Sequence, residues 1–224
     1  MSVLFGGWFI GGWVWSRNDS AVCAWVQRYY GQIMIAVQGI LWLFIGYRLS
    51  RCASFSAFLS RTGLGRRPTL LGFLIALLLI AMECVQARLV FRHWSYPYHS
   101  QPIVLRPLPG LSALYEEIIM RGFIYRAFRS SYGVIPSTLL ILFTSGLLHT
   151  FAFRSFGDVA VCFITWILLC QVRERSLSLW DCVLGHAAWN AVAQGDWLLC
   201  GAEMVIFLMF CRYPYKTGFG HAND

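Results

Sequence analysis

The chain has 224 residues, of which 58% are hydrophobic and only 12% are charged, and its formal net charge is +8. A soluble globular domain carries about 25% charged residues, so this composition excludes an ordinary soluble domain and indicates one compact integral membrane protein. The basic residues cluster between apolar runs and form no aromatic-interleaved patch, which indicates a positive-inside bias and excludes nucleic acid as the expected partner. The eight cysteines include no CxxC pair, so they support neither a zinc site nor a disulfide framework.

Apolar runs with few charges predict membrane-spanning helices along most of the chain. The first run, residues 3–15, lacks a basic region and a small-residue cleavage site, so we expect an interfacial segment or a short first span instead of a signal peptide. Seven clear spans follow, at about 29–47, 69–90, 110–128, 134–152, 157–172, 177–194 and 197–211. The expected fold class is all-α: a polytopic transmembrane bundle of about seven to eight helices with an intramembrane polar cavity.

The stretch YEEIIMRGFIY, residues 115–125, places three charges inside one of these apolar runs. A charge at the bilayer centre costs roughly 2.5 to 3.5 kcal/mol on insertion scales, so such residues need partners or a hydrated cavity and indicate function. Glu117 and Arg121 are four residues apart on one helix face and can pair, whereas Glu116 lies about 100° around the helix. The carboxylate that does not pair with Arg121 suits general acid/base chemistry. The alternative is that both glutamates belong to a structural ion-pair network.

Two later spans carry His149 and the stretch HAAWN, which runs from His186 to Asn190. A histidine near the end of a span is more often structural, and a polar clasp between packed helices also explains HAAWN. The i, i+4 spacing can equally turn the imidazole and the carboxamide toward one point, as an oxyanion hole requires. Because the three polar groups occur together, we expect them to meet in one hydrated cavity.

The order and spacing of these residues resemble a known family. Glu116-Glu117-x-x-x-Arg121, then His149 in the next span, then His186-x-x-x-Asn190 two spans later, match the motifs of the CPBP intramembrane proteases. This family includes type II CAAX prenyl proteases and bacteriocin-processing enzymes. The resemblance covers about residues 110–194. In one departure, the family's phenylalanine four residues before the histidine is replaced by Ser145, and the nearest phenylalanine is Phe143.

The resemblance implies that the protein hydrolyses a peptide bond within or at the membrane. It assigns water activation to Glu116 helped by His149, orientation of the site and substrate to Glu117 and Arg121, and stabilisation of the oxyanion to His186 and Asn190. We favour this metal-free, glutamic-type mechanism, with no cofactor. Two histidines and a glutamate can also ligate zinc, so a zinc-dependent mechanism is the alternative, although there is no HExxH pair.

The expected organisation is one structural domain. N-terminal helices and connecting loops occupy residues 1–109, the CPBP-like catalytic core 110–194, and the last transmembrane helix with a polar tail 195–224. We expect a multi-pass protein of the cell inner (plasma) membrane, whose partners are the lipid bilayer and a membrane-anchored protein or peptide substrate. The rival hypotheses are a non-catalytic binding or immunity protein of the same family and, less favoured, a proton-coupled transporter.

Glu83 and Glu203 also lie inside apolar runs. They either line the cavity or, as we expect, form structural pairs, with Arg88 as the partner for Glu83.

Overall fold

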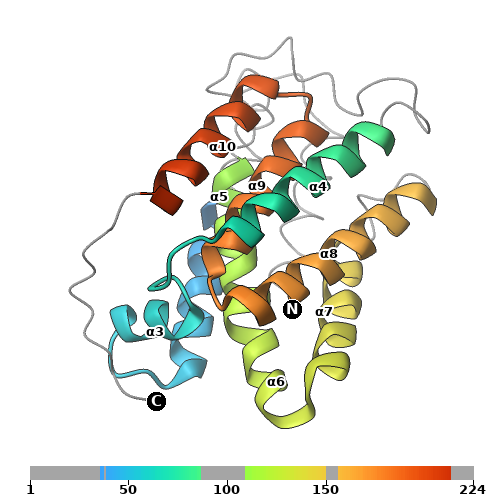
Figure 1. Ribbon diagram of the computed structural model, residues 1–224. Coiled ribbons are helices and arrows are strands. Elements are labelled where there is room, and N and C mark those ends of the chain that lie inside the picture. The colour runs from blue at the N-terminus through green and yellow to red at the C-terminus, as the bar shows by residue number, and fades with distance from the viewer. Residues whose placement is uncertain (1–35, 38, 87–108, 150–155, 213–224) are drawn as a thin grey trace, which may run out of the picture.

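The computed structural model describes residues 36–37, 39–86, 109–149 and 156–212, and this part of the chain is helical, without a strand (Figure 1). The first helix covers 36–50, apart from residue 38. The remaining elements are α3 (Phe55–Thr62), α4 (Leu70–Gln86), α5 (Pro109–Glu117), the π-helix η4 (Ile118–Ile124), α6 (Tyr125–Tyr132), α7 (Val134–His149), α8 (Phe156–Ser176), α9 (Leu179–Ala193) and α10 (Trp197–Arg212).

The all-α part of the predicted fold class is confirmed, and each of the seven predicted spans contains helix. Within the described parts of the chain, no helix combines the length and the apolarity that crossing a bilayer requires. The membrane-spanning part of the fold class therefore stays a prediction. The N-terminal run 3–15 lies outside the described residues.

The short helix α3 lies in the basic connection between the first two clear spans, where the sequence predicts only a loop. The hydroxyl of Ser54 accepts a hydrogen bond of 3.1 Å from the Ala57 N–H and caps the start of the helix. Gly63 ends it with φ of 98°, a left-handed conformation that glycine adopts without a Cβ penalty. Sequence periodicity missed α3 because a helix of two turns is too short to show a clear apolar face.

The centre of the bundle is α9, which packs against α4, α5, α8 and α10 (Figure 1). Most of its side chains are buried, as expected for a helix surrounded on several sides. Small residues allow this approach: a Cβ added to Gly185 would lie 3.8 Å from Ala76 on α4 and from Leu169 on α8. The central helix carries His186 and Asn190, so neighbouring helices can bring other polar groups to them.

Asp181, in the first turn of α9, fixes the start of α4. Its two carboxylate oxygens accept hydrogen bonds from the N–H and the hydroxyl of Thr69, at 2.7 and 2.8 Å. The Thr69 hydroxyl in turn accepts from the N–H of Gly72, which caps the helix. A Cβ at Gly72 would lie 2.3 Å from the Asp181 carboxyl, so only glycine permits this approach. The pairing sets the register between α4 and α9.

Three segments that carry arginine residues meet at one end of the bundle. Arg126, in the first turn of α6, donates a hydrogen bond to the carbonyl of Arg61 in α3. Arg173, near the end of α8, donates to the carbonyl of Thr62 at 2.9 Å. The Ser178 hydroxyl donates to the carbonyl of Arg66 at 3.3 Å. These contacts join α3, α6 and α8 at the end of the bundle away from Glu116.

Candidate active site

Three helices bring the predicted site residues together. Glu116 and Glu117 are the last two residues of α5, His149 is the last residue of α7, and His186 lies in the middle of α9. They meet because α5 packs on α9, whereas α7 is joined to the group through α6 and α8. The sequence predicted that these residues meet.

Glu117, Arg121 and His186 form the buried side of the site. One oxygen of Glu117, Oε1, accepts a hydrogen bond of 2.8 Å from Nη1 of Arg121 and lies 2.8 Å from Nδ1 of His186. The side chains of Glu117 and Arg121 are 0% and 1% exposed, and that of His186 is 4% exposed. The i, i+4 pairing predicted from the sequence is therefore present, and a buried charge pair of this kind is held by hydrogen bonds as well as by charge.

Glu116 forms the open side of the site. Its Oε2 atom lies 4.0 Å from Nε2 of His149 and 3.9 Å from Nε2 of His186. These separations exceed a direct hydrogen bond, so the three groups converge without being locked together. Glu116 is 24% exposed and His149 is 34% exposed. The site therefore has a buried ion pair on one side and a partly exposed edge, formed by Glu116 and His149, on the other. A substrate can approach from this edge.

The bonds made by the two Nδ1 atoms determine which imidazole nitrogens face Glu116. Nδ1 of His149 lies 2.8 Å from the carbonyl oxygen of Ser145. A carbonyl can only accept, so this nitrogen carries the proton. Nδ1 of His186 faces the Glu117 carboxylate, also an acceptor, and carries a proton for the same reason. Both histidines therefore turn Nε2 toward the same oxygen of Glu116.

The π-helix η4 begins directly after the two glutamates. The N–H of Tyr125 bonds to the carbonyl of Met120, five residues back, which is the π pattern. Such segments are rare and occur frequently at functional sites. Here the α-helical turn holds Glu116 and Glu117, and the widened turn holds the buried Arg121. No feature of the sequence predicts this change of helix type.

Asn190 lies one turn beyond His186 on the same face of α9 and is half-buried. Its carboxamide takes part in none of the hydrogen bonds described above. The structure therefore places Asn190 one helical turn from His186, and its role stays a prediction.

The aromatic neighbours of both histidines come from positions that the sequence did not indicate. Ser145 is buried on α7, whereas Phe143 is 63% exposed, so Phe143 does not replace the phenylalanine of the family motif. Trp166 of α8 lies beside His149 instead, with ring centroids 5.3 Å apart. Trp189 of α9 lies beside His186 at 5.8 Å. In the sequence alone, neither tryptophan differs from an ordinary core residue.

Glu116, His149 and His186 are more widely spaced than the ligands of a tetrahedral zinc ion. Ligands of a tetrahedral zinc ion at 2.0–2.1 Å lie roughly 3.3 Å apart, closer than Glu116 lies to either histidine. Within the described ranges, no group of three or more His, Cys, Asp or Glu side chains is arranged to hold a metal ion. Glu116, His149 and His186, as arranged, do not fit a zinc ion.

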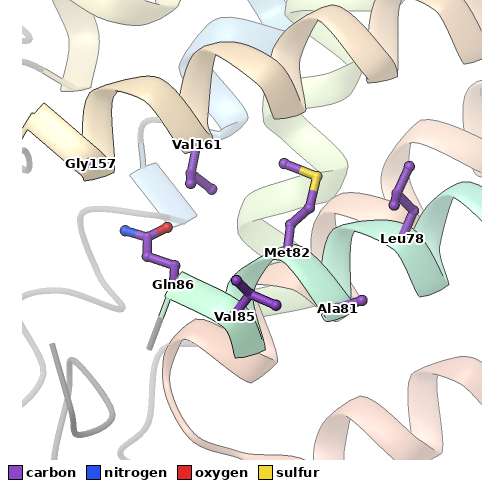
Figure 2. A pocket seen from close by; sticks show the side chains of 7 residues that line it. All are labelled: Leu78, Ala81, Met82, Val85, Gln86, Gly157 and Val161. Carbon is purple, nitrogen blue, oxygen red and sulfur yellow. The ribbon is translucent and has the colours of Figure 1, made fainter. Parts of the chain in front are cut away.

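A separate apolar pocket of about 430 Å³ lies between α4 and α8 (Figure 2). Six of its seven lining residues are apolar or glycine: Leu78, Ala81, Met82, Val85, Gly157 and Val161, with Gln86 as the seventh. None of the predicted site residues lines it. The lining of this pocket includes no acidic, basic or imidazole group, so the pocket offers no side chain that could activate water.

Residues 99–192 match the family model described as type II CAAX prenyl endopeptidase Rce1-like. This segment contains all six predicted site residues. The resemblance of this segment to the CAAX proteases, predicted from the sequence, is therefore confirmed. The Rce1-like family is membrane-associated and consists of proteases. No curated protein and no solved structure matches the chain.

Proposed function

We propose that the protein is an intramembrane endopeptidase that hydrolyses a peptide bond near the end of a membrane-anchored protein or peptide, using water activated by Glu116. The observation that carries this proposal is the position of one Glu116 oxygen, 4.0 and 3.9 Å from Nε2 of His149 and His186. A carboxylate and two imidazoles that converge at an accessible edge are suited to moving protons at a water molecule.

In the proposed reaction, Glu116 helped by Nε2 of His149 takes a proton from water while the water oxygen attacks the scissile carbonyl carbon. The carbonyl π electrons move to its oxygen and form an oxyanion. When the tetrahedral intermediate collapses, the C–N bond breaks and the proton passes to the leaving nitrogen. The products are a carboxylic acid and an amine, so the reaction balances with water alone.

His186 and Asn190 stabilise the oxyanion in this proposal. Because Nδ1–H of His186 is committed to Glu117, Nε2 can donate to an oxyanion only when the imidazole is protonated at both nitrogens. The carboxylates of Glu116 and Glu117 lie on either side of the ring. The carboxamide of Asn190 supplies the second donor. Glu117 and Arg121 hold His186 in place and orient the substrate.

Membrane embedding is part of the same proposal. Large apolar side chains are exposed on the outer faces of several helices, among them Leu74, Leu139, Phe143 and Leu198. Exposed apolar patches of this extent mark contact with lipid or a partner, and the family is membrane-associated. We place the protein in the cell inner (plasma) membrane as a multi-pass protein.

The test is cleavage by the full chain reconstituted in lipid nanodiscs. The probes are fluorescent peptides anchored by a prenylated C-terminal CAAX sequence, by an acyl chain, or by a transmembrane tail. Wild type is compared with Glu116→Gln and with the matched control Glu203→Gln, which changes a glutamate on α10 outside the site. We expect wild type and Glu203→Gln to cleave at least one peptide and Glu116→Gln to cleave none.

Other outcomes lead to other conclusions. Loss of cleavage with a chelator, restored by zinc, would replace the glutamic mechanism by the zinc-dependent one. Cleavage by Glu116→Gln at the wild-type rate would show that this residue does not activate water. If the peptides bind and none is cut, the non-catalytic binding protein becomes the better hypothesis. Proton flux coupled to peptide uptake, without cleavage, would support the transporter.

A further inference from the structure

Glu83 is a buried carboxylate on α4 that the proposed reaction does not use. It is 5% exposed, and its Oε2 atom accepts a hydrogen bond of 2.9 Å from the indole Nε1–H of Trp189 on α9. Arg88, the partner expected from the sequence, lies outside the described residues. Burying a carboxylate is costly unless hydrogen bonds compensate for the lost water, so the bond to Trp189 favours one arrangement of both side chains.

Trp189 connects this carboxylate to the site. It lies three residues after His186 on α9, and the two rings lie 5.8 Å apart at an angle of 37°. The bond from Nδ1 of His186 to Glu117 fixes one atom of the imidazole but leaves the ring free to tilt about that atom. The indole lies beside the ring and limits this tilt. The direction of Nε2 toward Glu116 therefore depends on where the indole is held.

Glu83 is the last of three contacts that fix α4 along one face of α9. Thr69 bonds to Asp181, Ala76 packs against Gly185, and Glu83 bonds to Trp189. The contacting residues are spaced by seven on α4 and by four on α9, so each set lies on one helix face. The order is the same on both helices, which therefore run in the same direction (Figure 1). The register set by Asp181 thus brings Glu83 level with the site.

The pocket between α4 and α8 lies beside this face of α4. The pocket-lining side chains nearest to Glu83 along the helix are Met82, Val85 and Gln86, and they point into the pocket (Figure 2). α4 thus has an apolar side turned to the pocket and a carboxylate turned to α9 at the same level. The carboxylate of Glu83 is stabilised among these apolar side chains by its bond to Trp189 and not by exposure to solvent.

We propose that Glu83 is a positioning residue of the active site, which acts through Trp189 to orient the imidazole of His186. The expected effect of Glu83 on catalysis rests on the proposed protease function. The orientation of His186 by Glu83 and Trp189 does not. Glu83 lies outside residues 99–192, the segment that matches the family model. A helix that precedes the family segment therefore takes part in building the site.

Four variants of the full chain in nanodiscs test this proposal. Trp189→Phe keeps a ring but removes the N–H donor, and Glu83→Leu removes the acceptor. Glu83→Gln keeps an acceptor oxygen and is the conservative rescue. Thr69→Val is the matched control, because it removes the hydroxyl bond to Asp181 at the far end of the same interface but keeps the Thr69 N–H bond that holds the register. Trp189→Phe also separates the indole contact from any other interaction of Glu83.

The first readout does not depend on activity. Histidines carrying ¹³C at the ring carbon between the two nitrogens are observed by NMR, and the signals of His186 and His149 are assigned with the His186→Gln and His149→Gln variants. We expect Trp189→Phe and Glu83→Leu to shift or broaden the His186 signal, because the indole ring current and the ring tilt both change. Glu83→Gln and Thr69→Val should leave it in place. The His149 signal, beside Trp166, is the internal control and should not move.

The second readout is cleavage kinetics. Misplacement of a reacting group by about 1 Å can cost on the order of 100-fold in rate, so we expect kcat to fall roughly 10- to 100-fold in Trp189→Phe and Glu83→Leu with little change in KM. Glu83→Gln should retain most of kcat, and Thr69→Val should lower stability without lowering kcat.

Each outcome decides one of the two proposals. An unchanged His186 signal in both Trp189→Phe and Glu83→Leu overturns the positioning role, whatever the cleavage data show. Movement of the His186 signal in Thr69→Val as well would show a general loosening of the α4–α9 interface and would also overturn it. If wild type cleaves none of the peptides but the His186 signal responds as expected, the positioning role stands and the protease proposal fails.

Discussion

Nδ1 of His186 lies 2.8 Å from Oε1 of Glu117, the oxygen that also accepts the hydrogen bond from Arg121. One buried carboxylate therefore holds both a guanidinium and an imidazole. The neighbouring carboxylate, Glu116, has no such bond to a cation and lies at the accessible edge, between the two Nε2 atoms. Two adjacent glutamates thus have different surroundings, and the proposed division of labour follows: Glu117 maintains the geometry and Glu116 moves the proton.

The buried pair should contribute far more to stability than an exposed one. Arg121→Gln leaves Glu117 buried without its cation and should cost about 3 to 5 kcal/mol. The matched control is Arg129→Gln, because Arg129 is also bonded to a glutamate, Glu174 at 3.1 Å, but is 42% exposed. This change should cost less than about 1 kcal/mol. Thermal unfolding in detergent micelles measures both, and equal losses of stability would contradict the assignment of a buried, structural ion pair.

His149 should be found with its proton on Nδ1. The bond from Nδ1 to the Ser145 carbonyl requires a donor at that nitrogen and leaves Nε2 able to accept a proton from water. ¹⁵N NMR of labelled histidine distinguishes the two neutral tautomers by the shifts of protonated and bare ring nitrogens, and His149→Gln identifies the signal. A neutral His149 with its proton on Nε2 would remove its proposed part in water activation.

Gly72 and Gly201 should respond to alanine in opposite directions. A Cβ at Gly72 would lie 2.3 Å from the Asp181 carboxyl, so Gly72→Ala should push α4 away from α9 and cost about 1 to 3 kcal/mol. A Cβ at Gly201, on α10, meets nothing within 4 Å. Gly201→Ala should therefore stabilise the helix by about 0.5 to 1 kcal/mol, because alanine loses less backbone entropy. Thermal unfolding of the two variants compares them directly, and a harmless Gly72→Ala would contradict the tight α4–α9 contact.

An arginine on the outer face of α7 tests whether this face contacts lipid. Leu139 is 59% exposed in the middle of α7, and in a bilayer Leu139→Arg should cost roughly 2.5 to 3.5 kcal/mol on insertion scales. The control is Tyr132→Arg, at the end of α6, where the side chain is 63% exposed and a charge can reach the interface. We expect Leu139→Arg to lower the amount of protein in the membrane fraction and Tyr132→Arg to leave it unchanged. Equal amounts for both would contradict the proposed contact with lipid.

Much of the candidate site could be predicted from the sequence, because charged and imidazole side chains are conspicuous inside apolar runs. The pairing of Glu117 with Arg121 follows from their spacing on one helix, and the structure contains it. The convergence of Glu116, His149 and His186 was also expected, since isolated polar groups in apolar helices need partners. Their roles in the reaction stay predictions.

Other features depend on contacts between residues far apart in the chain, which a single sequence does not display. The bond from Trp189 to Glu83 joins positions 106 residues apart. Glu83 was expected to pair with a nearby arginine, because a sequence shows near neighbours and not those across a helix interface. The π-helix gave no signal either, since its residues also fit an ordinary apolar helix.

The sequence by itself determined the helical class and the positions of seven helices, and it predicted the six polar residues of the candidate site, because hydrophobic runs and local spacing depend on neighbours along one helix. Only the tertiary structure decided which nitrogen of each histidine faces Glu116, which glutamate is buried, and which tryptophan lies beside which histidine. These properties depend on how α4, α5, α7, α8 and α9 are packed and rotated against one another, and helix packing is set by many side-chain contacts at once.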